Sequence, residues 1–194
     1  MERLQKRVAN SGYTSRRKAE KLILEGRVSV NNEIITELGY KVNNKDEIRV
    51  DDILLEKENK VYFLLNKPRE VVCTTEDDKN RKIITSLIDT DLRIFPVGRL
   101  DYDTTGLIIL TNDGEFANMI TSPKNKIEKV YIAKINGKLL PTEMISLKKG
   151  VLVEGRKTEK SKVKIKKYDK KTDTSIIEIT ITEGRNHQVK KMFE

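Results

Sequence analysis

The residues at positions 95–107 have the types and spacing best suited to chemistry in this chain. Pro96 and Gly98 favour an irregular backbone, and Arg99 and Asp101 follow them directly before an apolar segment typical of a strand. Loops held by rigid strands commonly carry catalytic groups. Asp101 is therefore a candidate catalytic residue, although its position also fits a turn residue or a cap. Asp103 is more typical of a turn former.

The rest of the composition narrows the chemistry. One cysteine and one histidine can form neither a disulfide framework nor a Cys/His zinc site, and they exclude histidine-rich catalysis. A metal site would have to rest on carboxylates. The longest apolar runs, at 61–65 and 107–110, are far shorter than the roughly 20 residues of a membrane span. The chain begins without an apolar secretion segment, so we expect a cytoplasmic protein that does not bind membranes.

Charge is concentrated at the two ends of the chain. The 194 residues carry a formal net charge of +9. Residues 1–30 hold eight basic and three acidic residues, and residues 124–194 hold nineteen basic and nine acidic residues. The segment between them is slightly acidic. Such asymmetry is typical of a protein that binds a polyanion, although a solvated lysine-rich surface would show the same excess.

The first 50 residues predict a small helical module closed by short strands. Leu4 and Val8 share a helical face, Ser11 and Gly12 interrupt it, and Ser15 is a candidate N-cap. A second helix should end near Gly26. Short strands are expected around Val28, Val30, Ile48 and Val50, with a turn at Asn31 and Asn32.

The first turn of that second helix is unusually basic. Arg16, Arg17 and Lys18 lie where the helix dipole disfavours cations. Free amide groups and cationic side chains at a helix N-terminus suit a phosphate backbone, so we favour contact with such a backbone over tolerated surface charge.

The module resembles the RNA-binding domain of ribosomal protein S-four, also called the αL motif. The resemblance rests on residues 4–9, 11–12, 15–20, 23, 26–28 and 30–31. It implies an RNA-binding domain at residues 1–56. The expected RNA contacts are Arg3, Lys6, Arg7, Arg16, Arg17, Lys18 and Lys21.

A polar linker at residues 57–60 precedes a larger domain at 61–194. Strands are expected at 61–65, 107–110, 130–135, 162–166 and 176–181, and helices at 113–120, 142–149 and 187–194. Lys162, Lys164 and Lys166 alternate with Val163 and Ile165, which predicts a row of ammonium groups for RNA on one face of a sheet. Cys73 is expected in a buried strand. This irregular mixture predicts an α+β fold, and the lack of a Gly-rich phosphate loop disfavours a doubly wound nucleotide fold.

The larger domain resembles the ribosomal RNA pseudouridine synthases of the RsuA/RluB/RluE/RluF group, closest to the RluB-like large-subunit enzymes. The matching motifs follow one another in order at residues 65–68, 95–107, 110–114, 128–131 and 183–192. The resemblance implies a mixed, largely antiparallel sheet. Family members continue past the last motif, so we expect the domain to be truncated at Glu194.

The resemblance also implies an activity and its residues. Uridine would be isomerised to pseudouridine in ribosomal RNA, expected to be 23S, by a monomer that binds a structured stem-loop and flips out the target base without metal or cofactor. Asp101 would be the nucleophile, Lys190 or alternatively Arg185 its cationic partner, and Tyr131 the residue packed against the base. The expected substrate contacts are Arg99, Lys67, Asn186, His187 and Gln188, with His187 as a polar positioning residue and not a base. The alternatives are a non-catalytic ribosomal RNA-binding or assembly factor, and the same reaction on 16S RNA.

Overall fold

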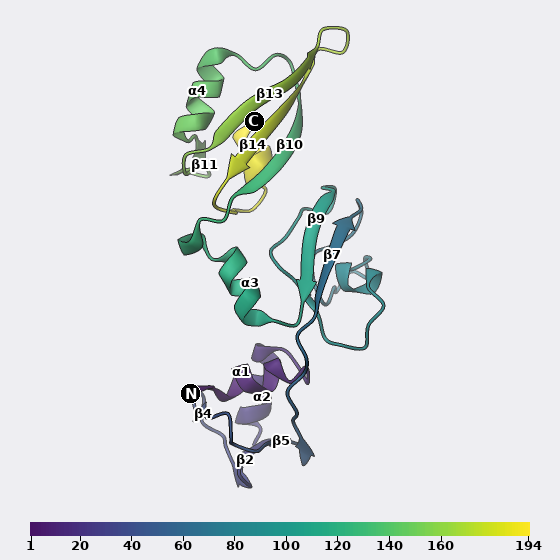
Figure 1. Cartoon of the computed structure of the whole chain (residues 1–194), viewed down its shortest axis with the longest axis vertical. Helices are drawn as coiled ribbons and strands as arrows, with labels where there is room; N and C mark the ends of the chain where they lie inside the picture. Colours follow the sequence, from purple (N-terminus) through teal and green to yellow (C-terminus); the bar gives the residue numbers. More distant parts are fainter. The chain divides into compact units, whose positions relative to one another are not determined.

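The computed structural model describes residues 1–194, which divide into two units, Met1–Asn118 and Met119–Glu194 (Figure 1). The first unit begins with β1 (Glu2–Arg3), α1 (Leu4–Asn10) and α2 (Arg16–Leu24). Ser15 caps α2 as expected, because its hydroxyl accepts a hydrogen bond from the Lys18 amide at 3.2 Å. The basic first turn of α2 is therefore held in helical form by a conventional cap.

A small sheet closes this N-terminal module. Its strand order is β3-β2-β5-β6, and β1 pairs separately with β4. Asn31 and Asn32 both have positive φ angles, 51° and 68°, which confirms the expected turn between β2 and β3. One core joins the helices to the sheet and includes Leu4, Val8, Ile23, Val28 and Val50. The strands are β2 (Val28–Val30), β3 (Glu33–Ile34), β4 (Lys41–Val42), β5 (Ile48–Val50) and β6 (Ile53–Leu54).

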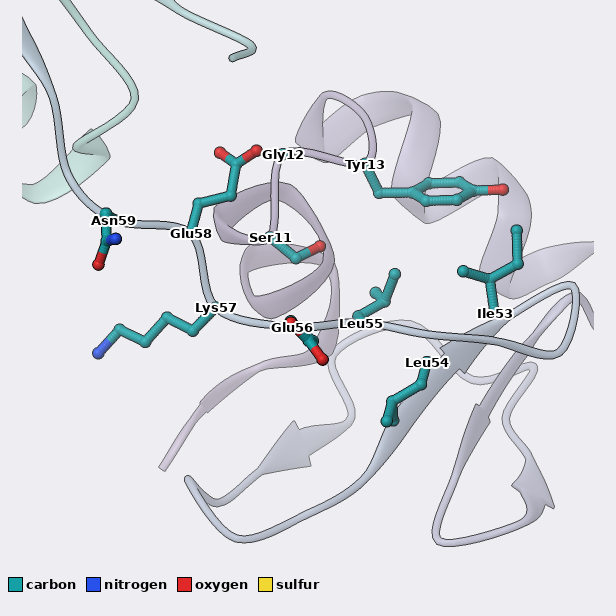
Figure 2. Close-up of a pocket in the computed structure, with 10 residues that line it drawn as sticks. All are labelled: Ser11, Gly12, Tyr13, Ile53, Leu54, Leu55, Glu56, Lys57, Glu58 and Asn59. Atoms are coloured by element: carbon teal, nitrogen blue, oxygen red, sulfur yellow. The ribbon is translucent and has the colours of Figure 1, made fainter. Parts of the chain in front are cut away.

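The segment after β6 runs along the turn between α1 and α2 and lines a groove with it (Figure 2). The carboxyl group of Glu58 lies against Gly12, where a Cβ atom would overlap it, and Gly12 also has a φ of 76°. Asn112 holds the other side of this segment. Its Nδ2 donates to Glu58 Oε2 at 3.2 Å and to the Asn59 carbonyl at 2.8 Å, and its Oδ1 accepts from the Val61 amide at 2.9 Å. The segment expected as a linker is thus fastened at both sides.

The rest of the first unit is built on a second antiparallel sheet with the order β7-β9-β8. It comprises β7 (Tyr62–Lys67), β8 (Phe95–Pro96) and β9 (Gly106–Thr111), and the 3-10 helix η1 (Ile84–Leu87) precedes β8. Ile84, Ile108 and Leu110 are buried in its core. Lys67 pairs with Gly106, so the end of β7 lies beside the start of β9. This register brings Lys67 to the loop that joins β8 to β9.

Asp113 fixes the start of α3 (Gly114–Thr121), which is followed by η2 (Pro123–Asn125). Its carboxylate accepts from the amides of Glu115 and Phe116 at 3.0 and 3.1 Å and from the Tyr62 hydroxyl at 2.8 Å, and it pairs with Lys60 at 2.7 Å. Burial would raise the pKa of Asp113, but the contacts with Lys60 and the other donors outweigh it and lower the pKa to about 2. Asp113 is therefore an ionised, nearly buried anchor.

The second unit is a three-stranded antiparallel sheet, order β10-β14-β13, with helices packed on it. Ile177, Ile179 and Ile181 alternate along β14 and are buried. Leu147 of α4 and Met192 of α5 belong to the same core, and Figure 1 shows α4 beside the sheet. The elements are β10 (Lys129–Asn136), α4 (Pro141–Lys149), β11 (Leu152–Val153), β12 (Arg156–Lys157), β13 (Lys162–Asp169), β14 (Thr174–Ile181) and α5 (Gln188–Met192).

These elements confirm the α+β fold class with antiparallel sheets. One detail of the sequence interpretation was wrong: Cys73 lies in a bend, half-buried, and not in a buried strand. In β13 the expected alternation holds from Lys162 to Ile165, and a register shift then follows between Ile165 and Lys167. Val163 is buried, and Ile165 is 40% exposed. The structure contains no helix with the length and apolar character needed to cross a bilayer.

Candidate active site and RNA-binding residues

Asp101 lies in the loop between β8 and β9 and is half-buried. Gly98 in this loop has a φ of 84°, a conformation that favours glycine. The Asp101 carbonyl accepts a hydrogen bond from the Thr104 amide at 3.0 Å, which closes a turn directly after the candidate nucleophile. Arg99, the expected substrate contact in the same loop, is exposed.

The residues on either side of Asp101 are both tied to the segment 67–73. The Leu100 amide donates to Cys73 Sγ at 3.3 Å. The Tyr102 carbonyl accepts from the Glu70 amide at 2.8 Å and from Lys67 Nζ at 3.4 Å. Asp101 is thus held through the backbone of its two neighbours, which limits how far its carboxylate can move.

Lys67 is the largest fully buried side chain of the protein. Its ammonium group also donates to the carbonyls of Pro68 and Val71, at 2.8 and 2.9 Å. Desolvation lowers the pKa of Lys67, although the nearby Cys73, Asp103 and Asp101 oppose the shift. The sequence interpretation assigned Lys67 to substrate contact. The structure instead directs its ammonium group to backbone carbonyls in the interior, because an unpaired buried cation would be costly.

The second unit holds the other expected site residues. Tyr131 is half-buried on β10, opposite Ile179 of β14, and packs against the core. The segment after β14 leads into α5, which has only five residues and follows His187 with a φ of 51°. Asn186, His187 and Lys190 are exposed, and Arg185 is half-buried. A half-buried tyrosine and an exposed, cationic segment therefore occur together in this unit.

Arg185 is engaged within its own unit. Its Nε donates to Glu183 Oε2 at 3.1 Å, Nη1 to the Arg156 carbonyl at 3.1 Å and Nη2 to the Lys157 carbonyl at 2.8 Å. The guanidinium nitrogens are thus all bonded within the unit, Nε to Glu183 and the other two to carbonyls of the strand β12. This arrangement favours a structural role for Arg185 over the role of cationic partner to a nucleophile.

Gln188 is only 4% exposed. Its Oε1 accepts from the Arg185 amide at 2.8 Å, and its Nε2 donates to Glu183 Oε1 at 2.7 Å. Both ends of the carboxamide are therefore bonded inside the unit. The sequence interpretation expected Gln188 to contact the substrate. The structure does not present it to a substrate, because the turn before α5 buries it.

Basic residues of the N-terminal module are exposed on α2 and ahead of α1. Some of them already pair with carboxylates of the first unit. Lys6 pairs with Glu115 at 2.7 Å and with Glu2 at 3.6 Å, and the bond to Glu115 raises its pKa despite some desolvation. Lys18 pairs with Glu76. Exposed basic residues are Arg3, Arg16, Arg17, Lys18 and Lys21, whereas Lys6 and Arg7 are half-buried.

The expected row of lysines on β13 is largely neutralised. Lys162 pairs with Glu128, and Lys166 pairs with Glu178 at 3.1 Å. Lys164 lies opposite Glu178 in the strand register. These carboxylates beside the lysines make the row a weaker candidate for phosphate contact than its sequence suggested.

Sequence reasoning missed two residues that support the site. Cys73 accepts from Leu100, 27 positions away, and no local pattern predicts such a bond. Glu183 lies inside a recognised motif, yet its bonds to Arg185, Gln188 and the Glu159 amide required the folded turn. Of the expected catalytic and substrate-contact residues, Asp101, Arg99 and Lys67 belong to the first unit and the others belong to the second.

Comparison with known proteins identifies both parts of the chain. Residues 61–194 match the family model described as RNA pseudouridylate synthase, and residues 2–48 match the S4 domain, an RNA-binding module. The chain is 53% identical over 196 residues to ribosomal large subunit pseudouridine synthase B of Bacillus subtilis, covering 100% of this chain and 80% of that protein.

Two further comparisons agree. An uncharacterized RNA pseudouridine synthase of Aquifex aeolicus is 44% identical over 194 residues, which covers 98% of this chain and 77% of that protein. A crystal structure of a pseudouridylate synthase aligns with a TM-score of 0.66 and 34% identity, over 100% of this chain and 82% of that one. The chain therefore belongs to the RNA pseudouridylate synthase family and carries an S4 domain ahead of its synthase domain.

Proposed function

We propose that this protein isomerises a specific uridine to pseudouridine in the ribosomal RNA of the large subunit. The observation that carries the proposal is the 53% identity, along the whole chain, to a protein named for that ribosomal subunit. In the reaction the bond from the ribose to the ring nitrogen breaks and a bond to a ring carbon forms. The proton on that carbon is released, and the freed nitrogen gains one, so no atom is lost overall.

Asp101 is the proposed nucleophile. Its neighbours Leu100 and Tyr102 are bonded to Cys73, Glu70 and Lys67, which supports a carboxylate held in one position. Pre-positioned reacting groups lower the barrier because their freedom is already restricted before the substrate binds. Covalent attack by a carboxylate also requires the ionised form.

Lys190 is the proposed cationic partner that keeps the nucleophile ionised. Burial of a carboxyl group in a closed pocket raises its pKa, and a nearby cation lowers it. The guanidinium of Arg185 is bonded to Glu183 and to two carbonyls of β12, which favours Lys190 for this role.

Tyr131 and Arg99 are proposed to hold the target nucleotide after it has flipped out of its stem-loop, with Tyr131 against the base. Asn186 and His187 are proposed as further RNA contacts. Flipping costs a few kcal/mol, and phosphate contacts by the S4 domain offset that cost. The protein is proposed to act as a monomer, without metal or organic cofactor.

The test is tritium release from unmodified ribosomal RNA labelled on the uracil carbon that becomes the new attachment point. We expect release by the parent protein and none by Asp101→Asn, which keeps the shape of the side chain but removes its charge. RNA affinity should be nearly equal for the two proteins, because Asp101 carries out chemistry and does not supply phosphate contact.

The outcomes separate the proposal from its competitors. Release only from small-subunit RNA would move the target to 16S RNA. Tight RNA binding without release on either subunit RNA would favour a non-catalytic assembly factor. Undiminished release by Asp101→Asn would contradict the proposed nucleophile.

A further inference from the structure

We infer that Gln188 is a positioning residue whose buried carboxamide holds the turn at residues 183–188 and thereby orients α5 and Lys190. The inference rests on the proposed function, because it takes Lys190 to be a working residue of the synthase. It assigns Gln188 a role different from the substrate contact expected from sequence.

The carboxamide joins two points of the turn. Gln188 Oε1 accepts from the Arg185 amide at 2.8 Å, and Nε2 donates to Glu183 Oε1 at 2.7 Å. Only a side chain with one acceptor and one donor can make both bonds at once, so neither glutamate nor methionine reproduces them. Because the side chain is 4% exposed, water cannot readily replace a lost partner.

Glu183 extends this connection to a neighbouring hairpin. Its Oε1 also accepts from the Glu159 amide at 2.9 Å, and its Oε2 accepts from Arg185 Nε at 3.1 Å. Arg185 in turn reaches the carbonyls of Arg156 and Lys157 in β12. The turn is thus hydrogen-bonded to residues 156–159 through Glu183 and Arg185. Gln188, the first residue of α5, connects these contacts to the helix through its bond to Glu183.

The short helix needs such support. α5 spans only five residues, far below the roughly 12 residues at which isolated helices become even marginal in water. It also starts from His187 in the left-handed conformation, which non-glycine residues adopt reluctantly. Met192 packs in the core at its far end, and Gln188 fixes its near end. Lys190 lies between these two anchors, so its direction depends on both.

The first experiment compares Gln188→Met with the parent. Methionine fills the same space but makes neither bond. We expect the single-turnover rate to fall roughly 10- to 100-fold through misplacement of Lys190, with RNA affinity unchanged within about twofold.

Ser175→Ala is the matched control. Ser175 is fully buried at the other end of β14, and its hydroxyl donates to the Gly137 carbonyl at 2.7 Å. This variant also loses a buried hydrogen bond in the same unit, so it should lower the melting temperature. It should leave the single-turnover rate unchanged, which separates positioning from general destabilisation.

A reversed pair tests the bond itself. Gln188→Glu keeps the acceptor for the Arg185 amide but sets two carboxylates against each other, and we expect its rate to fall as well. Adding Glu183→Gln to that variant puts a donor opposite the new carboxylate, at the cost of the acceptor for the Glu159 amide. The double variant should recover part of the rate that Gln188→Glu loses, which would support a direct role for this bond.

Hydrogen exchange provides a readout that does not depend on activity. The amides of Arg185 and α5 should exchange faster in Gln188→Met than in the parent or in Ser175→Ala. Unchanged exchange, or an unchanged rate in an active parent background, would overturn the inference. An inactive parent would instead contradict the proposed function, and exchange would still decide the role of Gln188.

Discussion

The loop that carries Asp101 and the turn that leads to Lys190 are held by different kinds of contact. Asp101 is held through the backbone of its two neighbours. The Tyr102 carbonyl accepts from the buried ammonium group of Lys67, and the Leu100 amide donates to the half-buried thiol of Cys73. The turn before Lys190 is fixed by side chains bonded to one another, with Glu183 at the centre. An uncharged side chain cannot replace the buried cation, whereas other hydrogen-bonding side chains can replace members of a side-chain network. The two regions should therefore respond differently to mutation.

The largest effect is expected from Lys67→Met, which removes the buried cation. The carbonyls of Pro68 and Val71 lose the Lys67 donor. We expect the free energy of unfolding to fall by about 2–4 kcal/mol. The rate of pseudouridine formation should fall too, because the Tyr102 carbonyl loses one of its two donors and keeps only the Glu70 amide. Urea unfolding measures the first effect and tritium release the second.

Lys79→Met provides the control in the same unit, because Lys79 is exposed. It should change the free energy of unfolding little. If Lys67→Met were no more destabilising than this control, the contrast between the two regions would not hold.

A smaller, pH-dependent effect is expected from Asp113, the second buried charge of the first unit. Its folded pKa of about 2 lies below the ordinary 3.8, so its ionised form stabilises the folded chain. That contribution is complete above about pH 5 and is lost as the pH falls through 4 toward 2. Asp113→Asn keeps the helix cap but not the charge.

Urea unfolding at a series of pH values should therefore show the parent and Asp113→Asn converging as the pH falls. A constant difference between the two proteins across this range would show that the charge of Asp113 contributes nothing. The same titration should leave the Gln188 carboxamide unaffected, which sharpens the contrast between a charged and a neutral support.

The smallest effect is expected from Glu154→Gln in the second unit. Glu154 pairs with Lys191 at the surface, and its side chain is 65% exposed. Exposed ion pairs contribute little because water and salt screen them. We expect no measurable change in the urea midpoint or the reaction rate. A clear loss of rate would show that surface charge, and not only the Glu183 network, orients α5.

Much of the fold was predictable because it depends on local patterns. The two helices of the N-terminal module, the Ser15 cap and the turn at Asn31 and Asn32 follow from spacing and side-chain chemistry. Strand β14 follows from its alternating isoleucines. The β13 bulge was not predictable, since it is set by pairing with β14 and not by the lysine pattern.

The sequence by itself determined the family, because its motifs occur in a fixed order, and with it the expected nucleophile Asp101. It also determined which residues could carry charge. Only the tertiary structure decided which of those charges are buried supports. Lys67, Arg185 and Gln188 all looked like residues for binding substrate or pairing with the nucleophile, yet each is directed to backbone or side-chain partners within its unit. The physical reason is that burial and hydrogen-bond partners depend on segments distant in sequence, which residue type and spacing do not specify.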